Sequence, residues 1–169
     1  MLLRWEIAWV KYWMVEFFCD LFAVYTLGPA FVWAHLHLTA KRGEGPFAVP
    51  VLSLSSHPAD DARMRVMLRA LSVSGYSAEA TTIEGRWREL IMQASAKPEP
   101  EYHRCFPEDL LTRVAEYARV GVEAIGCRLA KPTISDPIHS ALNAAWNEFW
   151  RDPEGFVDWE KESVARLMP

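Results

Sequence analysis

Residues 15–31, VEFFCDLFAVYTLGPAF, are apolar at almost every position. A helix of this composition is apolar around its whole circumference, which is typical of helices buried in a protein core. The run is broken by Gly28 and Pro29, a pair that ends one helix and opens the next. The longest charge-free run in this region, from Leu21 to Ala34, is shorter than the ~20 residues that a bilayer span requires. We therefore predict a central helix of a globular core, with a membrane-surface segment as the alternative.

The remaining sequence has the pattern of further helices separated by proline and glycine. We predict an all-α fold, a single helical domain of about six to seven helices with a C-terminal helical subdomain. Residues 1–97 are expected to form a first helical region, and residues 98–169 a helical extension packed on it. Residues 96–107 are expected to be a linker, and residues 47–55 are a weak candidate for an extended segment because Pro50 cannot donate to a sheet. The expected helices span residues 4–27, 29–40, 58–75, 81–96, 107–130, 137–151 and 153–168.

Composition excludes several classes of function. The net charge is −4 and no long basic block occurs, so we expect no nucleic-acid binding. The sequence contains no nucleophile elbow and no phosphate-binding loop. Cys19, Cys105 and Cys127 are widely spaced and form no CxxC pair, which indicates a reducing, cytoplasmic environment rather than a disulfide framework. Charged residues interrupt the N-terminal apolar segment, which argues against a signal peptide.

Two carboxylates interrupt the apolar helix. At helical spacing Glu16 and Asp20 lie on one stripe with two tryptophans, Trp9 and Trp13. An unpaired charge in such surroundings costs several kcal/mol, so a positive group should compensate for it. We expect both carboxylates to face inward, with Arg63 or His57 within reach. An exposed pair on an ordinary helix surface is the alternative.

The motifs around these residues also resemble those of a known protein family. ExxxD at Glu16 and Asp20, followed by GPA at 28–30 and SxHPxxxxR at 55–63, resembles the C-terminal half of the gluzincin zinc metallopeptidases, especially their HtpX-related group. The resemblance implies that Glu16 is the third zinc ligand and that Asp20 orients a zinc-binding histidine of an HExxH helix. It places His57 and Arg63 beside the site. The implied activity is hydrolysis of a peptide or protein substrate, with zinc as the cofactor.

The HExxH motif itself is absent from the sequence. A zinc peptidase site needs three protein ligands and an open position, and only Glu16 is identified here. We therefore expect that this chain alone does not hydrolyse peptides and does not bind zinc tightly. Either the chain is the C-terminal part of a longer reading frame, or the metal-binding half has been lost or is supplied elsewhere. A non-enzymatic all-α interaction module is the competing interpretation.

The loss of a packing partner has a predictable consequence. If a helix once covered the face that bears Trp9 and Trp13, its absence exposes aromatic surface, and the chain should self-associate or bind a partner helix. If the chain is a complete module, a later helix such as residues 107–130 must cover that face.

Two further histidines, His35 and His37, diverge by about 200° on a helix and cannot chelate one ion. We expect one to cap the end of the helix over residues 29–40 and the other to face solvent.

The C-terminal region is rich in aromatic residues at roughly helical spacing. Helix–helix packing is the simpler interpretation of this pattern, and a surface for a docking partner is the alternative. The residues concerned are Trp146, Phe149, Trp150, Phe156 and Trp159.

Overall fold

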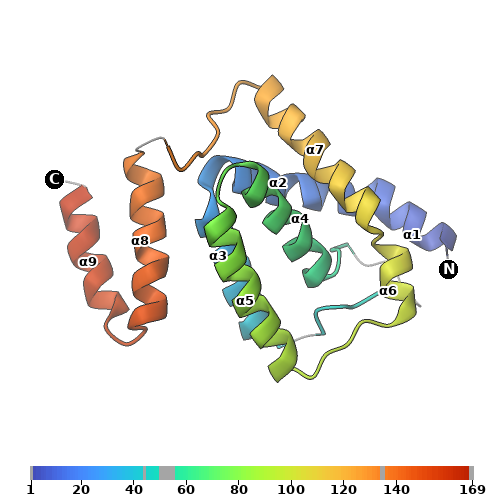
Figure 1. Cartoon of the computed structure of the whole chain (residues 1–169), viewed down its shortest axis with the longest axis horizontal. Coiled ribbons are helices and arrows are strands. Elements are labelled where there is room, and N and C mark those ends of the chain that lie inside the picture. Colours follow the sequence, from blue (N-terminus) through green and yellow to red (C-terminus); the bar gives the residue numbers. More distant parts are fainter. Residues whose placement is uncertain (1, 44, 50–55, 134–135, 168–169) are drawn as a thin grey trace. The chain divides into compact units, whose positions relative to one another are not determined.

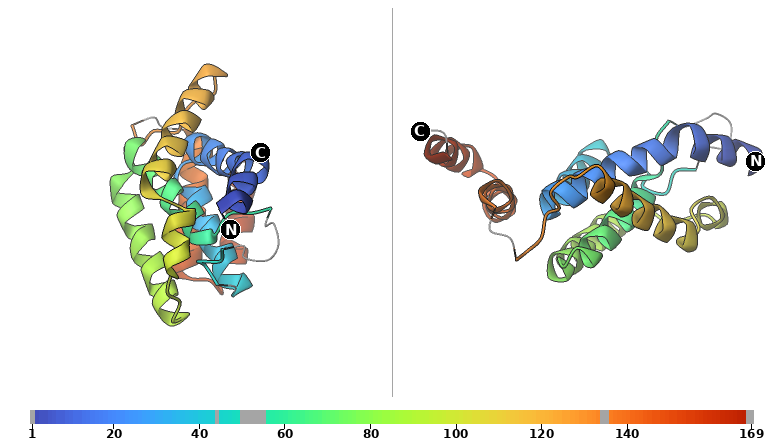
Figure 2. Two further views of the ribbon diagram at one scale, coloured as in Figure 1. Left: turned by 90° about the vertical axis from the view of Figure 1, so that its right-hand side faces the viewer. Right: turned by 90° about the horizontal axis from the view of Figure 1, so that it is seen from above.

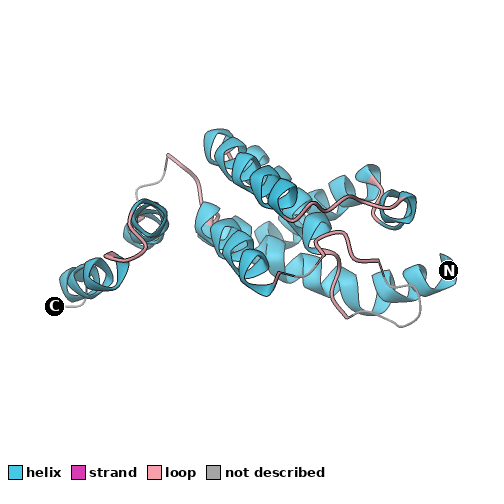
Figure 3. Ribbon diagram, turned by 90° about the horizontal axis from the view of Figure 1, so that it is seen from below, coloured by secondary structure: helices cyan, strands magenta, loops and turns pink. Residues whose placement is uncertain are grey.

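The computed structural model describes residues 2–43, 45–49, 56–133 and 136–167 (Figure 1). Helices dominate this part of the chain, and no strand occurs in it (Figure 3), which confirms the all-α prediction. The chain divides into two compact units, which we call the N-terminal unit, residues 1–132, and the C-terminal unit, residues 133–169. Most of the predicted extended segment, residues 50–55, lies outside the described residues.

The N-terminal unit begins with one long helical rod (Figure 2). It consists of α1, Leu2–Ala8, a π-helical turn, Trp9–Trp13, and α2, Met14–Leu27. The expected helix over residues 4–27 is therefore present, but its periodicity does not reveal the π turn. At the end of α2 the chain turns at Gly28, whose φ of 70° is a conformation that favours glycine. Helix α3, Pro29–Arg42, then starts with proline in its first turn.

The described residues of this unit form four more helices. They are α4, Asp60–Val73, α5, Ser77–Gln93, α6, Pro100–Cys105, and α7, Glu108–Ala124. The linker prediction for residues 96–107 is wrong over α6, because Pro100 is accommodated in the first turn of a short helix. The last helix of the unit is shorter than expected and is followed by Gly126, which has a φ of 75°.

The core lies where α2, α4 and α7 pack against one another. The rod also contacts the end of α6 and the residue that follows it: the Trp9 indole nitrogen donates to the Cys105 carbonyl oxygen at 3.0 Å, and the Trp13 ring centroid lies 4.9 Å from that of Phe106. Trp13 has no exposed surface. Of the two alternatives for this aromatic face, the structure shows the covered one, because Cys105 and Phe106, later in the same chain, lie against it.

The C-terminal unit is a helical hairpin of α8, Pro137–Arg151, and α9, Phe156–Leu167. Asp136 caps α8 by accepting hydrogen bonds from the backbone nitrogens of Ile138 and His139. The turn between the helices is held by a 3.0 Å hydrogen bond from the Gly155 nitrogen to an Asp152 carboxylate oxygen. Among the described helices of both units, none has the length and apolar character needed to cross a membrane.

Candidate functional site

The two carboxylates of α2 lie in different environments. Asp20 is buried, with 4% of its surface exposed. The guanidinium of Arg63, on α4, binds it in a bidentate manner: Nε donates to Oδ2 at 2.7 Å and Nη2 to Oδ1 at 2.8 Å. Two parallel charge-assisted hydrogen bonds are among the strongest polar contacts in proteins. The expected pairing of an α2 carboxylate with Arg63 is confirmed, and it ties α2 to α4.

A second acidic residue joins this pair. Asp60 Oδ1 lies 4.0 Å from Arg63 Nη1 and accepts a 2.7 Å hydrogen bond from Nη2 of Arg42 on α3. Although burial disfavours the charged guanidinium, hydrogen bonding to Asp20 and the negative charges of Asp20 and Asp60 raise the pKa of Arg63 above its usual value. Two arginines and two aspartates thus balance one another where α2, α3 and α4 meet.

Glu16 lies one turn earlier on α2, and 32% of its side chain is exposed. Its Oε2 is 2.9 Å from Nδ1 of His57, a residue whose side chain is 63% exposed. Pro58 follows His57 directly and disfavours helical backbone there, so His57 lies outside α4. The expectation that His57 reaches a carboxylate is confirmed. The expectation that both carboxylates face inward holds for Asp20 and is wrong for Glu16, which lies at the edge of the buried stripe.

His35 belongs to the same region, although the sequence interpretation placed it elsewhere. Helix α3 continues to Arg42, so neither His35 nor His37 is in its final turn. His35 is buried, and its Nε2 lies 3.2 Å from the backbone oxygen of Asp60. His37 is only half-buried. The capping prediction is wrong because the helix is longer than expected, while the buried neighbours Val32, Leu36 and Thr39 share the inward face with His35.

Burial of His35 predicts a pH-dependent stability. Desolvation lowers the pKa of His35 below its usual value of 6.5, the charge of Arg63 lowers it further, and Asp60 and Asp20 partly oppose this. As the pH falls below 6.5 the unfolded chain gains a proton that the folded chain does not, so the free energy of unfolding decreases. This single group contributes at most about 1.4 kcal/mol per pH unit.

Urea unfolding at pH 7.5, 6.5 and 5.5 measures this effect. His35→Gln should reduce the acid-side slope, whereas His103→Gln, which alters an exposed histidine, should retain it. Parallel pH profiles for the wild type and His35→Gln would show that His35 does not control the slope.

A second buried polar cluster lies around Asp61, and sequence reasoning missed it. The Asp61 carboxylate accepts hydrogen bonds from the indole nitrogen of Trp87 at 2.8 Å and from the hydroxyl of Tyr102. Arg65 donates to the Tyr102 oxygen at 3.1 Å. Burial and the nearby Asp61 charge raise the pKa of Tyr102 well above its usual value. These contacts join α4, α5 and α6, and they have the character of a structural support rather than of a reactive centre.

The described residues do not by themselves form a zinc centre. Within the part of the chain that the structure covers, no group of three His, Cys, Asp or Glu side chains is placed to hold a metal ion. Glu16 and His57 are two donors where a zinc site needs at least three. Comparison of the chain with family models, curated proteins and solved structures found no match. The function is therefore inferred from the geometry around Glu16 and Asp20.

Proposed function

We propose that the N-terminal unit is the ligand-presenting part of a gluzincin-like zinc metallopeptidase and is inactive alone. Glu16 is the metal ligand that this chain would contribute. The observation that supports this is that two carboxylates one turn apart differ in burial and in hydrogen bonding. Asp20 is buried and held by Arg63 through two hydrogen bonds, whereas Glu16 remains accessible at the surface. Such an arrangement orients the exposed carboxylate through a rigid neighbour.

In this proposal Asp20 and Arg63 have a positioning role. Their ion pair holds α2 against α4, and this fixed packing sets the direction in which Glu16 projects. Each Asp20 oxygen has a further lone pair beyond the one that Arg63 occupies, so the carboxylate retains the capacity to accept from an incoming histidine. His57 contacts Glu16 directly and is the residue of this chain that would lie beside a substrate.

The surface around Glu16 supports completion of the site by another segment. Tyr12 and Cys19, which are at helical spacing from Glu16, and the preceding residue Val15 are all exposed. An apolar patch beside an accessible carboxylate is a suitable binding surface for an amphipathic helix. We propose that the occupant is a helix that carries HExxH and that is not part of the sequence described here.

A non-enzymatic interaction module is the second candidate function. The observation that favours it is the hydrogen bond between Glu16 and His57, which satisfies the carboxylate without a metal ion. In that case Tyr12, Val15 and Cys19 form a docking surface for a partner helix. An in-frame HExxH in the coding sequence preceding Met1 would favour the peptidase, and a stop codon there would favour the module.

Zinc binding distinguishes the two functions. Calorimetric titration of the purified chain with zinc chloride at pH 7 should show no tight stoichiometric site, because one carboxylate and scattered histidines are too few ligands. When a helical peptide that contains one HExxH motif is added, a tight site should form. Glu16→Gln removes a direct ligand and should weaken that site by at least the roughly 10- to 100-fold that loss of an outer-shell partner costs, whereas Glu6→Gln, an exposed residue earlier on the same rod, should not change it.

Two results would contradict these expectations. Tight zinc binding by the chain alone would reveal a ligand set that includes residues other than Glu16. Zinc binding with the peptide that is equally tight in the wild type and in Glu16→Gln would remove the peptidase proposal and leave the interaction module.

A further inference from the structure

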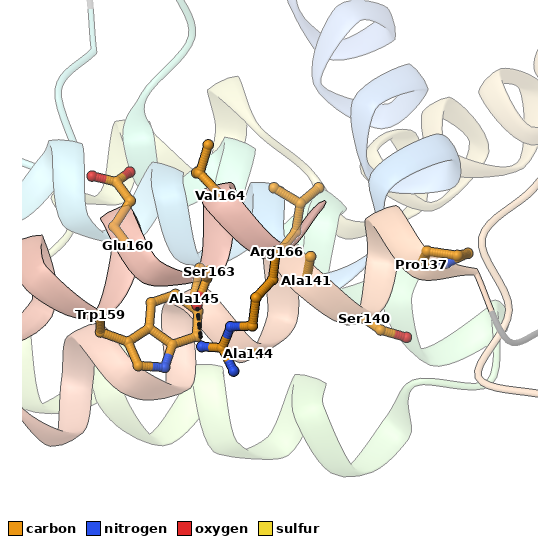
Figure 4. Close-up of a pocket in the computed structure, with 11 residues that line it drawn as sticks. Pro137, Ser140, Ala141, Ala144, Ala145, Trp159, Glu160, Ser163, Val164 and Arg166 are labelled. Atoms are coloured by element: carbon orange, nitrogen blue, oxygen red, sulfur yellow. Dashed lines mark hydrogen bonds between the residues drawn. The ribbon is translucent and has the colours of Figure 1, made fainter. Parts of the chain in front are cut away.

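The C-terminal hairpin contains an apolar groove of about 620 Å³ along one side of α8 and α9 (Figure 4). The groove is independent of the site around Glu16, because every residue that lines it belongs to the C-terminal unit. The α8 side is made mostly of small side chains, and the α9 side contributes larger ones. Its lining residues are Pro137, Ser140, Ala141, Leu142, Ala144, Ala145, Trp159, Glu160, Ser163, Val164 and Arg166.

The shape of the groove is suited to binding a helix. On α8 its floor follows one helix face, with Ala144 and Ala145 one turn after Ala141. Alanine side chains allow the backbone of another helix to approach closely. On α9 Trp159 and Val164 supply the larger apolar surfaces that such a helix would contact, and Arg166 is directed toward Ser163 at the same side (Figure 4).

The hairpin does not cover this surface with its own residues. None of the described residues of the C-terminal unit is buried, and Ile138, Trp150, Val157 and Val164 are exposed. A unit of this size is below the length at which a chain usually builds a sufficient core alone. Apolar surface that a small unit leaves uncovered is typical of an interaction site.

Charge indicates which kind of helix fits. Residues 133–169 contain seven acidic and three basic side chains, so this unit carries the entire net charge of −4. Glu160 lines the groove. Arg166 lines it as well, and Glu148 near the end of α8 is paired with Arg151, so the excess of negative charge belongs to the unit as a whole. These charges oppose a second copy of the hairpin and attract a basic partner.

We propose that the α8–α9 groove binds an amphipathic helix of a partner protein that has an apolar ridge flanked by lysine and arginine. The ridge would pack over Ala141, Ala144 and Trp159, and one basic flank would lie beside Glu160. Recognition of this kind uses anchors at i, i+3, i+4 and i+7 of the bound helix. Because α8 has 15 residues, a partner of about four turns matches its length.

Fluorescence anisotropy with the full chain tests the proposal. The probes are two labelled 15-residue helical peptides with the same leucine ridge, one with lysine and one with glutamate at the other positions. The Leu/Lys peptide should bind at least about tenfold more tightly, and rising salt should weaken it. Ala144→Gln should weaken its binding about tenfold by filling the groove. Ala165→Gln, on α9 outside the groove, should have no effect.

Charge variants keep the test independent of packing. Glu160→Lys should weaken the Leu/Lys peptide several-fold by repulsion, whereas Glu162→Lys, on the same helix outside the groove, should weaken it much less. Equal binding of the two peptides, or equal effects of the paired variants, would overturn the proposal. Sedimentation showing a dimer of the chain that Ala144→Gln dissociates would also overturn it, because the occupant would then be a second copy.

Discussion

Replacing Asp20 by asparagine is expected to lower the free energy of unfolding by about 3–5 kcal/mol, because it leaves the largely buried guanidinium of Arg63 without its bidentate carboxylate and with only the more distant Asp60. The two side chains have nearly the same volume, so the loss reports the charge rather than a cavity. Urea unfolding followed by circular dichroism at neutral pH measures the change. The double variant Asp20→Leu/Arg63→Met should recover much of the loss, since it removes both charges together.

The matched control lies one turn away on the same helix. Glu16→Gln alters an ion pair whose partner, His57, is mostly exposed, and exposed pairs contribute about 0–1 kcal/mol. The proposed site depends on this inequality between a structural and an accessible carboxylate. Equal losses for Asp20→Asn and Glu16→Gln would show that the two carboxylates are not differentiated as the geometry indicates.

The double change Trp9→Ser/Trp13→Ser is expected to unfold the chain. Each buried tryptophan that is truncated costs about 3–5 kcal/mol, and the two residues pack on the same segment around Phe106. Even with incomplete additivity, the combined loss approaches the total stability of about 5–15 kcal/mol that a domain possesses. Circular dichroism should show the loss of a cooperative transition, and light scattering should show aggregation.

Two exposed residues of the same rod provide the control. Val10→Ser/Met14→Ser changes side chains on the outer face, where Val10 is 78% exposed, and should leave the cooperative transition nearly unchanged. If the wild type is instead oligomeric and Trp9→Ser/Trp13→Ser renders it monomeric and folded, the aromatic face is open in solution, and its coverage by Phe106 does not hold.

Much of the fold could be predicted from local patterns. Periodicity located the helices, and proline and glycine marked their ends, as at Gly28 and at Pro137, because capping and backbone restrictions act within a few residues. The pairing around Asp20 was also predictable. A carboxylate within an apolar helix requires compensation wherever it is buried, and the candidates Arg63 and His57 follow from the sequence. Their functional roles stay predictions.

What the sequence by itself determined is therefore the all-α class, most helix positions and the need for a basic partner at the α2 carboxylates. Only the tertiary structure decided that Asp20 is buried while Glu16 stays accessible, that His35 lies against Asp60, and that α6 interrupts the expected linker. It also decided that Phe106 covers the tryptophan face. The physical reason is that helix periodicity specifies which residues share a face, whereas the depth of each residue depends on packing between segments that lie far apart in the chain.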